Sequence, residues 1–133
     1  MKPTLKPGLA HTKKITVDES RVIAFMGDDC RVYATPRIIG DVEYTCRNFL
    51  LEHLDPGEDT VGTRVNWEHV GPALLGADVT ISIKLTNVDG RRVTFEVTVN
   101  DGADAVARGT HERFVVDIQK MRERLLKKKA QRG

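Results

Sequence analysis

The segment spanning residues 34–54 most constrains the fold, because it is the only long, strongly helix-periodic stretch before the C-terminal end. Thr35 is expected to cap the helix and Pro36 to occupy its first turn, where the missing N–H costs nothing. Asp55-Pro56-Gly57 ends the helix. At about 100° per residue, one continuous face is apolar except at its edge, where Glu43 lies. That face consists of Ile38, Ile39, Val42, Cys46, Phe49, Leu50 and His53.

Strand candidates fill most of the remaining chain. Residues 10–17 form a predicted first strand, Ser20 is expected to cap a short helical turn reaching Met26, and residues 30–33 form a connector. Four strands are predicted after the helix, over residues 60–70, 78–88, 92–100 and 105–117, with Asp89-Gly90 and Asp101-Gly102 as turns. Alternation places Val61, Thr63, Val65, Trp67 and His69 on one face of the first of these strands. It turns Val79, Ile81, Ile83 and Leu85, and then Val93, Phe95, Val97 and Val99, toward a core.

This order of elements predicts an α+β fold with one long helix against a curved antiparallel sheet. A second helix is predicted over residues 118–129, with Ile118, Met121 and Leu125 as its apolar row. At 133 residues, without an internal repeat or a linker, the chain is expected to be a single domain over residues 1–133.

Composition restricts the class of protein. The chain is 40% hydrophobic and 30% charged, and its N-terminal stretch has no apolar core, so neither a signal peptide nor a membrane span is expected. A cytoplasmic protein is therefore predicted. Cys30 and Cys46 give no paired framework, and both are expected to be reduced.

Charge is distributed unevenly along the chain. The net charge is +2, but residues 118–133 carry seven Lys/Arg and one Glu, which is +6 and leaves −4 for the rest. Such a basic end can contact nucleic acid. The simpler interpretation is a solvated helix end whose cations complement the helix dipole, and no aromatic side chains interleave the charges as single-strand binding would require. No nucleic-acid partner is therefore predicted.

The sequence lacks several familiar site motifs. It has no glycine-rich phosphate loop and no GxSxG elbow, and His11, His53, His69 and His111 are too scattered to indicate a metal site. Neither a metal nor a cofactor is therefore predicted.

Three polar residues near the long helix remain as candidates for chemistry. Thr35 lies where free N–H groups and the helix dipole favour a developing negative charge, although the residues alone strongly favour a plain N-cap. Glu43, at the edge of the apolar face, would be partly buried and suited to act as a base near neutral pH, or is an ordinary edge residue. His69 lies in an apolar strand row, where a hydrogen-bonded core histidine is the common alternative to a catalyst.

Four segments together carry a family resemblance: TPRIIGDVEYTC, LDPGEDTVGTRVNWEH, NVDGRRVTFEV and DGADAVARGTHER. Over residues 33–116 the chain resembles bacterial hotdog thioesterases of the fluoroacetyl-CoA thioesterase type, with the spacing between motifs preserved. The resemblance implies a hotdog fold and a catalytic set of Thr35, Glu43 and His69. It further implies roles for Gly62 and Arg113 in substrate or oxyanion binding, and a homodimer with the active site at the subunit boundary.

The activity implied by the resemblance is hydrolysis of a short or small acyl-CoA thioester, with CoA entering only as part of the substrate. Whether Thr35 or a water is the nucleophile stays open. A non-catalytic hotdog protein that binds an acyl-CoA or a related ligand is the alternative, because fold does not guarantee reaction. The segment MGDDCRVYATP before the helix has no Phe after Phe25, whereas the fluoroacetyl-CoA enzyme has a Phe-containing lid there. We therefore predict no strong preference for fluoroacetyl-CoA over acetyl-CoA.

Overall fold

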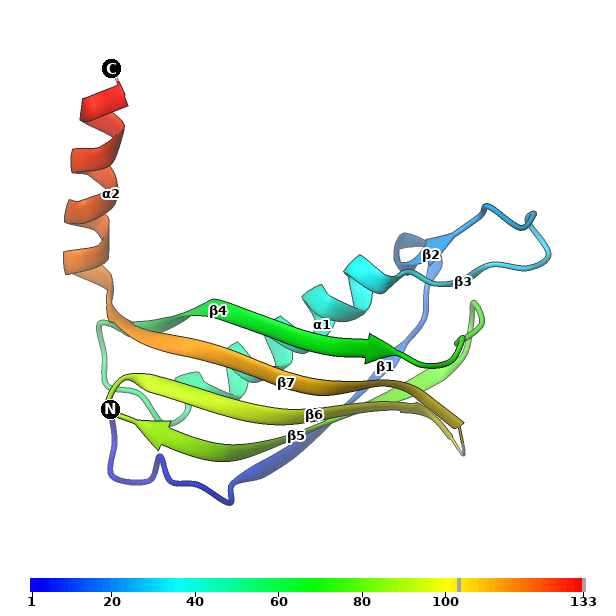
Figure 1. Cartoon of the computed structure of the whole chain (residues 1–133), viewed down its shortest axis with the longest axis horizontal. Coiled ribbons are helices and arrows are strands. Elements are labelled where there is room, and N and C mark those ends of the chain that lie inside the picture. Colours follow the sequence, from blue (N-terminus) through cyan, green and yellow to red (C-terminus); the bar gives the residue numbers. More distant parts are fainter. Residues whose placement is uncertain (103, 133) are drawn as a thin grey trace.

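A five-stranded antiparallel sheet in the order β1-β5-β6-β7-β4 is covered on one face by α1 (Figure 1). The computed structural model describes residues 1–102 and 104–132. In chain order the elements are β1 (Ala10–Thr16), the 3-10 turn η1 (Glu19–Arg21), β2 (Val22–Ile23), β3 (Val32–Tyr33), α1 (Thr35–Leu51), β4 (Glu58–His69), β5 (Asp78–Asp89), β6 (Arg92–Asp101), β7 (Asp104–Asp117) and α2 (Ile118–Arg132). The arrangement is the predicted hotdog fold.

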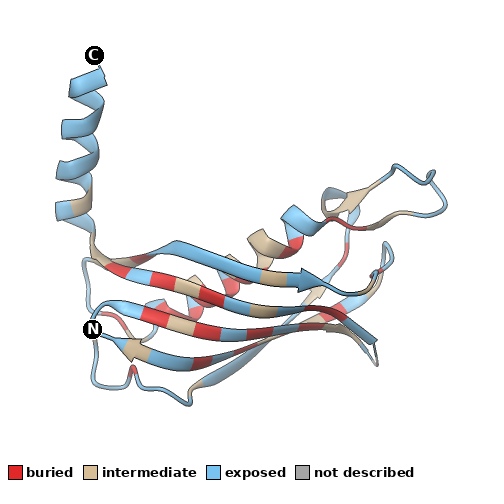
Figure 2. Cartoon of the chain, in the orientation of Figure 1, coloured by how far each residue is buried: buried red, intermediate tan, exposed pale blue. Residues whose placement is uncertain are grey.

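The core lies between the sheet and α1, as the sequence periodicity predicts. Buried and exposed residues alternate along β5 and β6, and the predicted inward residues of both strands are all buried (Figure 2). The apolar face of α1 is buried at Ile38, Val42, Cys46, Phe49 and Leu50. Burying each large side chain of this kind contributes about 1.5–3 kcal/mol, so this layer accounts for much of the stability of the fold.

Three local predictions on the N-terminal side of α1 are wrong. Asp18 rather than Ser20 caps the short turn, since its carboxylate accepts from the Ser20 N–H at 3.0 Å. The predicted connector contains β3, which pairs with β2 as a small two-stranded ribbon. Ala34 rather than Thr35 is the N-cap of α1, and Thr35 is the first helical residue.

β4 is an edge strand and carries an irregularity that the sequence did not predict. Gly62 pairs with Arg113 but Arg64 pairs with Glu112, so the register shifts by one residue between them. Such a bulge reverses the faces of the residues beyond it. Val61 therefore does not share a face with Val65, Trp67 and His69, and the predicted five-residue face is correct only for the last three. Val61 and Val65 are 38% and 40% exposed along this edge.

α2 begins directly after β7 and stands away from the sheet, beyond the β4 edge (Figure 1). None of its described residues is buried, and Leu125 and Leu126 are more than half exposed. Among the described residues, neither of the two helices, α1 and α2, has the length and apolar character needed to cross a bilayer.

Candidate active site

The start of α1 is held in place by the segment that precedes it. The Tyr33 N–H donates to the Ala73 carbonyl and the Ala34 N–H to the Arg21 carbonyl, both at 2.8 Å. Asp41, in the second turn of α1, accepts from the Arg21 guanidinium at 2.8 Å and from the Tyr33 hydroxyl. Burial raises the pKa of Tyr33, so its hydroxyl remains a proton donor in this contact. These contacts hold the start of α1, and with it the backbone of Thr35.

Thr35 and His69 form a hydrogen-bonded pair. The Thr35 Oγ1 lies 2.7 Å from His69 Nδ1, although the two residues are 34 positions apart in the sequence. Both residues are exposed. His69 is the last residue of β4, and Thr35 is the first of α1, so the pair closes the gap between the end of the strand and the start of the helix. The hydroxyl predicted to cap the helix contacts an imidazole instead.

An apolar pocket of about 230 Å³ opens beside this pair. Trp67 forms part of its wall, and the indole Nε1–H is buried without a hydrogen-bond partner among the described residues. Gly109 makes room for this ring, since a Cβ there would lie 2.5 Å from Trp67 Cδ1. The pocket therefore offers a small apolar space directly against a hydroxyl–imidazole pair. Its lining consists of Thr35, Ile38, Ile39, Val65, Trp67, His69 and Ala107.

Glu43 lies in a second group of residues, which we call the Glu43 cradle: Glu43, Gly62, His111 and Arg113. Gly62 touches the carboxylate so closely that an added Cβ would lie 2.4 Å from Glu43 Oε1. Arg113 Nη1 lies 3.9 Å and His111 Nε2 4.0 Å from the same oxygen. The Glu43 side chain is 40% exposed, whereas His111 and Arg113 are buried. One carboxylate oxygen is thus surrounded by glycine, a guanidinium and an imidazole.

Arg113 is anchored before it reaches Glu43. Its Nε donates to Thr60 Oγ1 at 2.7 Å and its Nη2 to the Thr60 carbonyl at 2.9 Å. Burial lowers the pKa of Arg113, and the Glu43 carboxylate acts in the opposite direction. An arginine remains charged in proteins, so the cradle presents a fixed positive charge to Glu43.

The two groups do not meet within one chain. Thr35 and Glu43 are eight residues apart on α1, which at about 1.5 Å rise per residue separates their backbones by about 12 Å. Gly62 and His69 are separated by most of β4, about 20 Å at strand spacing. The structure therefore brings together two of the three predicted catalytic residues, and places the third with both predicted binding residues, Gly62 and Arg113.

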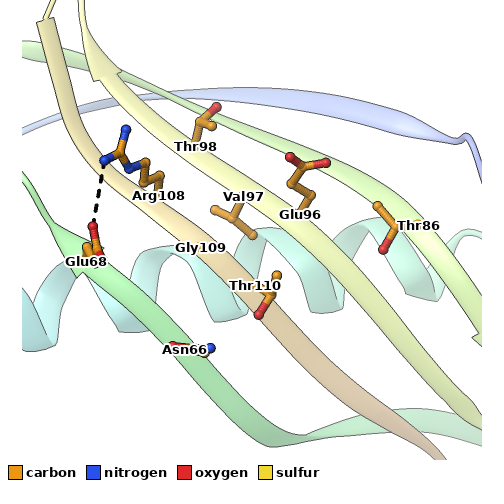
Figure 3. A pocket seen from close by; sticks show the side chains of 9 residues that line it. All are labelled: Asn66, Glu68, Thr86, Glu96, Val97, Thr98, Arg108, Gly109 and Thr110. Carbon is orange, nitrogen blue, oxygen red and sulfur yellow. Dashed lines mark ion pairs between the residues drawn. The ribbon is translucent and has the colours of Figure 1, made fainter.

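Two other places among the described residues provide neither a histidine nor a reactive thiol. A hollow of about 580 Å³ lies on the face of the sheet turned away from α1 and contains the Arg108–Glu68 ion pair and several threonines, with no histidine in its lining (Figure 3). Cys46 is fully buried, and burial raises the pKa of its thiol to about 12, so it stays protonated. The Thr35–His69 pair and the Glu43 cradle remain.

Sequence reasoning missed His111 as part of the site. His111 pairs with Val65 across the β4–β7 ladder and lies two residues before Arg113, on the same face of β7. The only available signal was this i, i+2 spacing to a motif arginine, together with the buried face on which both residues fall. Trp67 was placed on the correct strand face, but its role as a pocket wall was not predicted.

Comparison with known proteins gives concordant matches. The sequence profile of the fluoroacetyl-CoA-specific thioesterases matches residues 17–119. A fluoroacetyl-CoA thioesterase from Streptantibioticus cattleyicolor is 34% identical over 97 residues, which cover 73% of this chain and 70% of that protein. A solved structure of the fluoroacetyl-CoA thioesterase FlK superimposes with a TM-score of 0.84 at 27% identity, covering 93% of this chain and 97% of that one. A Thermus thermophilus thioesterase superfamily member shares the fold at 24% identity, with a TM-score of 0.85 over 98% and 99% of the two chains.

Proposed function

Because the chain belongs to the fluoroacetyl-CoA-specific thioesterase family and is a thioesterase, we propose that it hydrolyses a short acyl-CoA with Thr35, His69 and Glu43 as its catalytic set. The observation that carries this proposal is the 2.7 Å contact between Thr35 and His69 beside a small apolar pocket. A hydroxyl–imidazole pair at a helix start is suited to act on a thioester carbonyl. The carbonyl oxygen gains negative charge during attack, and the start of a helix stabilises negative charge.

Each group has a role in the proposed reaction. Glu43 takes a proton from a water, whose oxygen adds to the thioester carbonyl carbon. The carbonyl oxygen becomes an oxyanion, stabilised by backbone N–H at the start of α1. The C–S bond then breaks, the carbonyl re-forms as the acid, and the Thr35–His69 pair delivers a proton to the departing CoA sulfur. Exchange with solvent then removes the proton held by Glu43 and restores the one that the pair has lost. A preorganised oxyanion donor contributes about 2.7–4 kcal/mol to such a step.

We propose that the two groups meet across a homodimer. β4 is the edge of the sheet, and a second copy can add to it antiparallel about a two-fold axis. An axis near the middle of β4 would place Gly62 of one chain opposite His69 of the other. Each of the two sites would then combine the Thr35–His69 pair of one subunit with the Glu43 cradle of its partner. The exposed Val61 and Val65 on this edge support such pairing.

Mixing two inactive variants tests the shared site. Thr35→Ala and Glu43→Gln proteins are unfolded together, refolded and assayed for thiol release from acyl-CoA. A heterodimer with shared sites has one site that carries both substitutions and one that carries neither, so the mixture should regain about a quarter of wild-type activity, with about half of the dimers mixed. Sites contained within one chain would regain none. The matched control is each variant refolded alone, which should stay inactive.

The acyl group is proposed to be small and not specifically fluorinated. The pocket beside Thr35 is about 230 Å³, and the segment before α1 does not cover it with aromatic side chains: Phe25 and Met26 are 88% and 58% exposed. Shape alone discriminates between small groups by about 1–3 kcal/mol. A panel of acyl-CoA substrates followed by free thiol release tests this proposal. A ratio of kcat/KM of about 10⁴ or more for fluoroacetyl-CoA over acetyl-CoA would contradict it. Tight binding of acyl-CoA without turnover would instead identify a binding protein.

A further inference from the structure

His111 is a buried ring with no direct access to the pocket, yet it contacts three parts of the site. Its Nδ1 lies 2.8 Å from the Arg64 carbonyl, at the bulge of β4. Its Nε2 lies 3.3 Å from Arg113 Nη1 and 4.0 Å from Glu43 Oε1. Its ring is also 6.2 Å from that of Trp67, edge to face.

These contacts determine which nitrogen carries the proton. A carbonyl only accepts, so Nδ1 must donate to Arg64. A guanidinium only donates, so Nε2 must carry a lone pair and accept from Arg113. The ring is therefore the neutral Nδ1–H tautomer. Burial lowers the pKa of His111, and the Arg113 charge lowers it further, which is consistent with a neutral ring.

We propose that His111 is a positioning residue for catalysis, which fixes Arg113 and the β4 bulge so that the Glu43 carboxylate is held against Gly62. With Nε and Nη2 of Arg113 bound to Thr60, the His111 contact at Nη1 completes the orientation of the guanidinium. The bond to Arg64 holds the bulge that turns Gly62 toward Glu43. His111 thus acts on the reaction through two neighbours rather than by touching substrate, and this role rests on the proposed function of Glu43.

Protonation of the ring would undo this arrangement. An N–H at Nε2 would face the Arg113 N–H groups, donor against donor and charge against charge. The charged groups around the ring are Arg113 and Glu112 on β7 and Glu43 on α1, and β4 contributes the Arg64 carbonyl. A residue at this position that cannot titrate should therefore change the acidic side of the pH–rate profile.

Two substitutions separate the two contacts of the ring. His111→Asn keeps a donor near Nδ1 for Arg64 but has no group to meet Arg113, whereas His111→Gln reaches the Nε2 position with an oxygen that accepts from Arg113. We expect His111→Asn to lower kcat by about ten- to a hundredfold, with KM changed less than about threefold. The substitution misplaces the Glu43 carboxylate but leaves the binding of substrate largely unchanged. His111→Gln should recover much of kcat. It should also remove the part of the activity loss at acidic pH that is caused by protonation of the His111 ring. His53→Asn, a half-buried histidine bound to Thr4, is the control and should match wild type.

Two measurements decide the proposal, and the first of them does not depend on turnover. Imidazole nitrogen NMR of the wild-type protein near neutral pH should show a neutral Nδ1–H tautomer at His111, and a protonated ring or an Nε2–H tautomer would overturn the proposal. Wild-type kcat in folded His111→Asn, with folding verified by circular dichroism, would also overturn it. Absence of thiol release by wild-type protein with every acyl-CoA would refute the proposed function instead, and the NMR result would still test the geometry.

Discussion

The Thr35–His69 pair and the Glu43 cradle both use α1 and β4, to which the cradle adds His111 and Arg113 of β7, and they differ in how they are held. The pair is exposed and depends on one hydrogen bond between residues at the ends of their elements. The cradle lies midway along α1 and β4, where buried Arg113 is bound to Thr60 and buried His111 to the Arg64 carbonyl. The pair is therefore free to adapt to a ligand, whereas the cradle is preorganised. Substitutions at the pair should affect mainly chemistry, and those at the cradle both chemistry and stability.

The largest expected effect on activity comes from removing the ionisable group of the Glu43 cradle or that of the Thr35–His69 pair. Glu43→Gln and His69→Ala should each lower kcat/KM by about 10²-fold or more, the usual cost of losing acid–base catalysis. Steady-state thiol release measures this loss. Near-normal turnover in both variants would remove these residues from the mechanism.

A methyl group at Gly62 should break the cradle without touching the pair. The Cβ of Gly62→Ala would lie 2.4 Å from Glu43 Oε1, so the carboxylate must move. We expect about a ten- to hundredfold loss of kcat/KM, the cost of a misplacement of this size. Gly40→Ala on α1 is the matched control, because nothing lies within 4 Å of its added Cβ. Equal activity in the two variants would mean that the position of Glu43 is unimportant.

Substitutions in the Glu43 cradle should lower the free energy of unfolding more than substitutions in the Thr35–His69 pair. Arg113→Met removes the donors to Thr60, and the buried Thr60 carbonyl loses a partner, so we expect the free energy of unfolding to fall by about 1–3 kcal/mol. Thr35→Val removes one exposed hydrogen bond and should change it by less than about 0.5 kcal/mol. Urea unfolding followed by circular dichroism compares the two. A greater loss in Thr35→Val would reverse the assignment of buried and exposed groups.

The smallest expected effect is on the pH dependence of stability. Burial holds the pKa of His111 below its ordinary 6.5 in the folded protein. As pH falls through 6.5 the unfolded chain binds a proton first, so the free energy of unfolding decreases until the folded ring is also protonated. The contribution of His111 is complete above that pH. His111→Gln should therefore lose less stability than wild type between about pH 7.5 and 5.5. An identical loss in both proteins would show that carboxylates alone cause it.

The elements of the fold could be predicted from local pattern, whereas the site could be predicted only in part. The apolar face of α1 and the inward rows of β5 and β6 follow from periodicity, because each residue's face depends on its immediate neighbours. The β4 bulge could not be predicted in this way, since the one residue inserted between Gly62 and Arg64 reverses the faces beyond it without changing the pattern of residue types in the sequence. The Thr35 hydroxyl was misassigned because its partner, His69, is remote in sequence and the local cap was the nearer explanation.

The family resemblance supplied the candidate residues, and the fold determines how they are grouped. The predicted set of Thr35, Glu43 and His69 divides between two places because residues eight positions apart on a helix cannot meet. From the sequence, His111 was considered only as a metal ligand and was set aside because the four histidines are scattered. Only the pairing of β4 with β7, which puts it beside Val65 and two residues from Arg113, reveals its place. Long-range register is the information that a single sequence does not show.

Trp67, the one tryptophan of the chain, stands between the two groups. Its ring forms a wall of the pocket beside Thr35 on one side and meets the edge of His111 on the other. An indole in this position serves as an optical reporter that needs no label. Its emission depends on the polarity around the ring, so the fluorescence of the unmodified protein should follow occupation of the pocket during a titration, and the same signal should register unfolding.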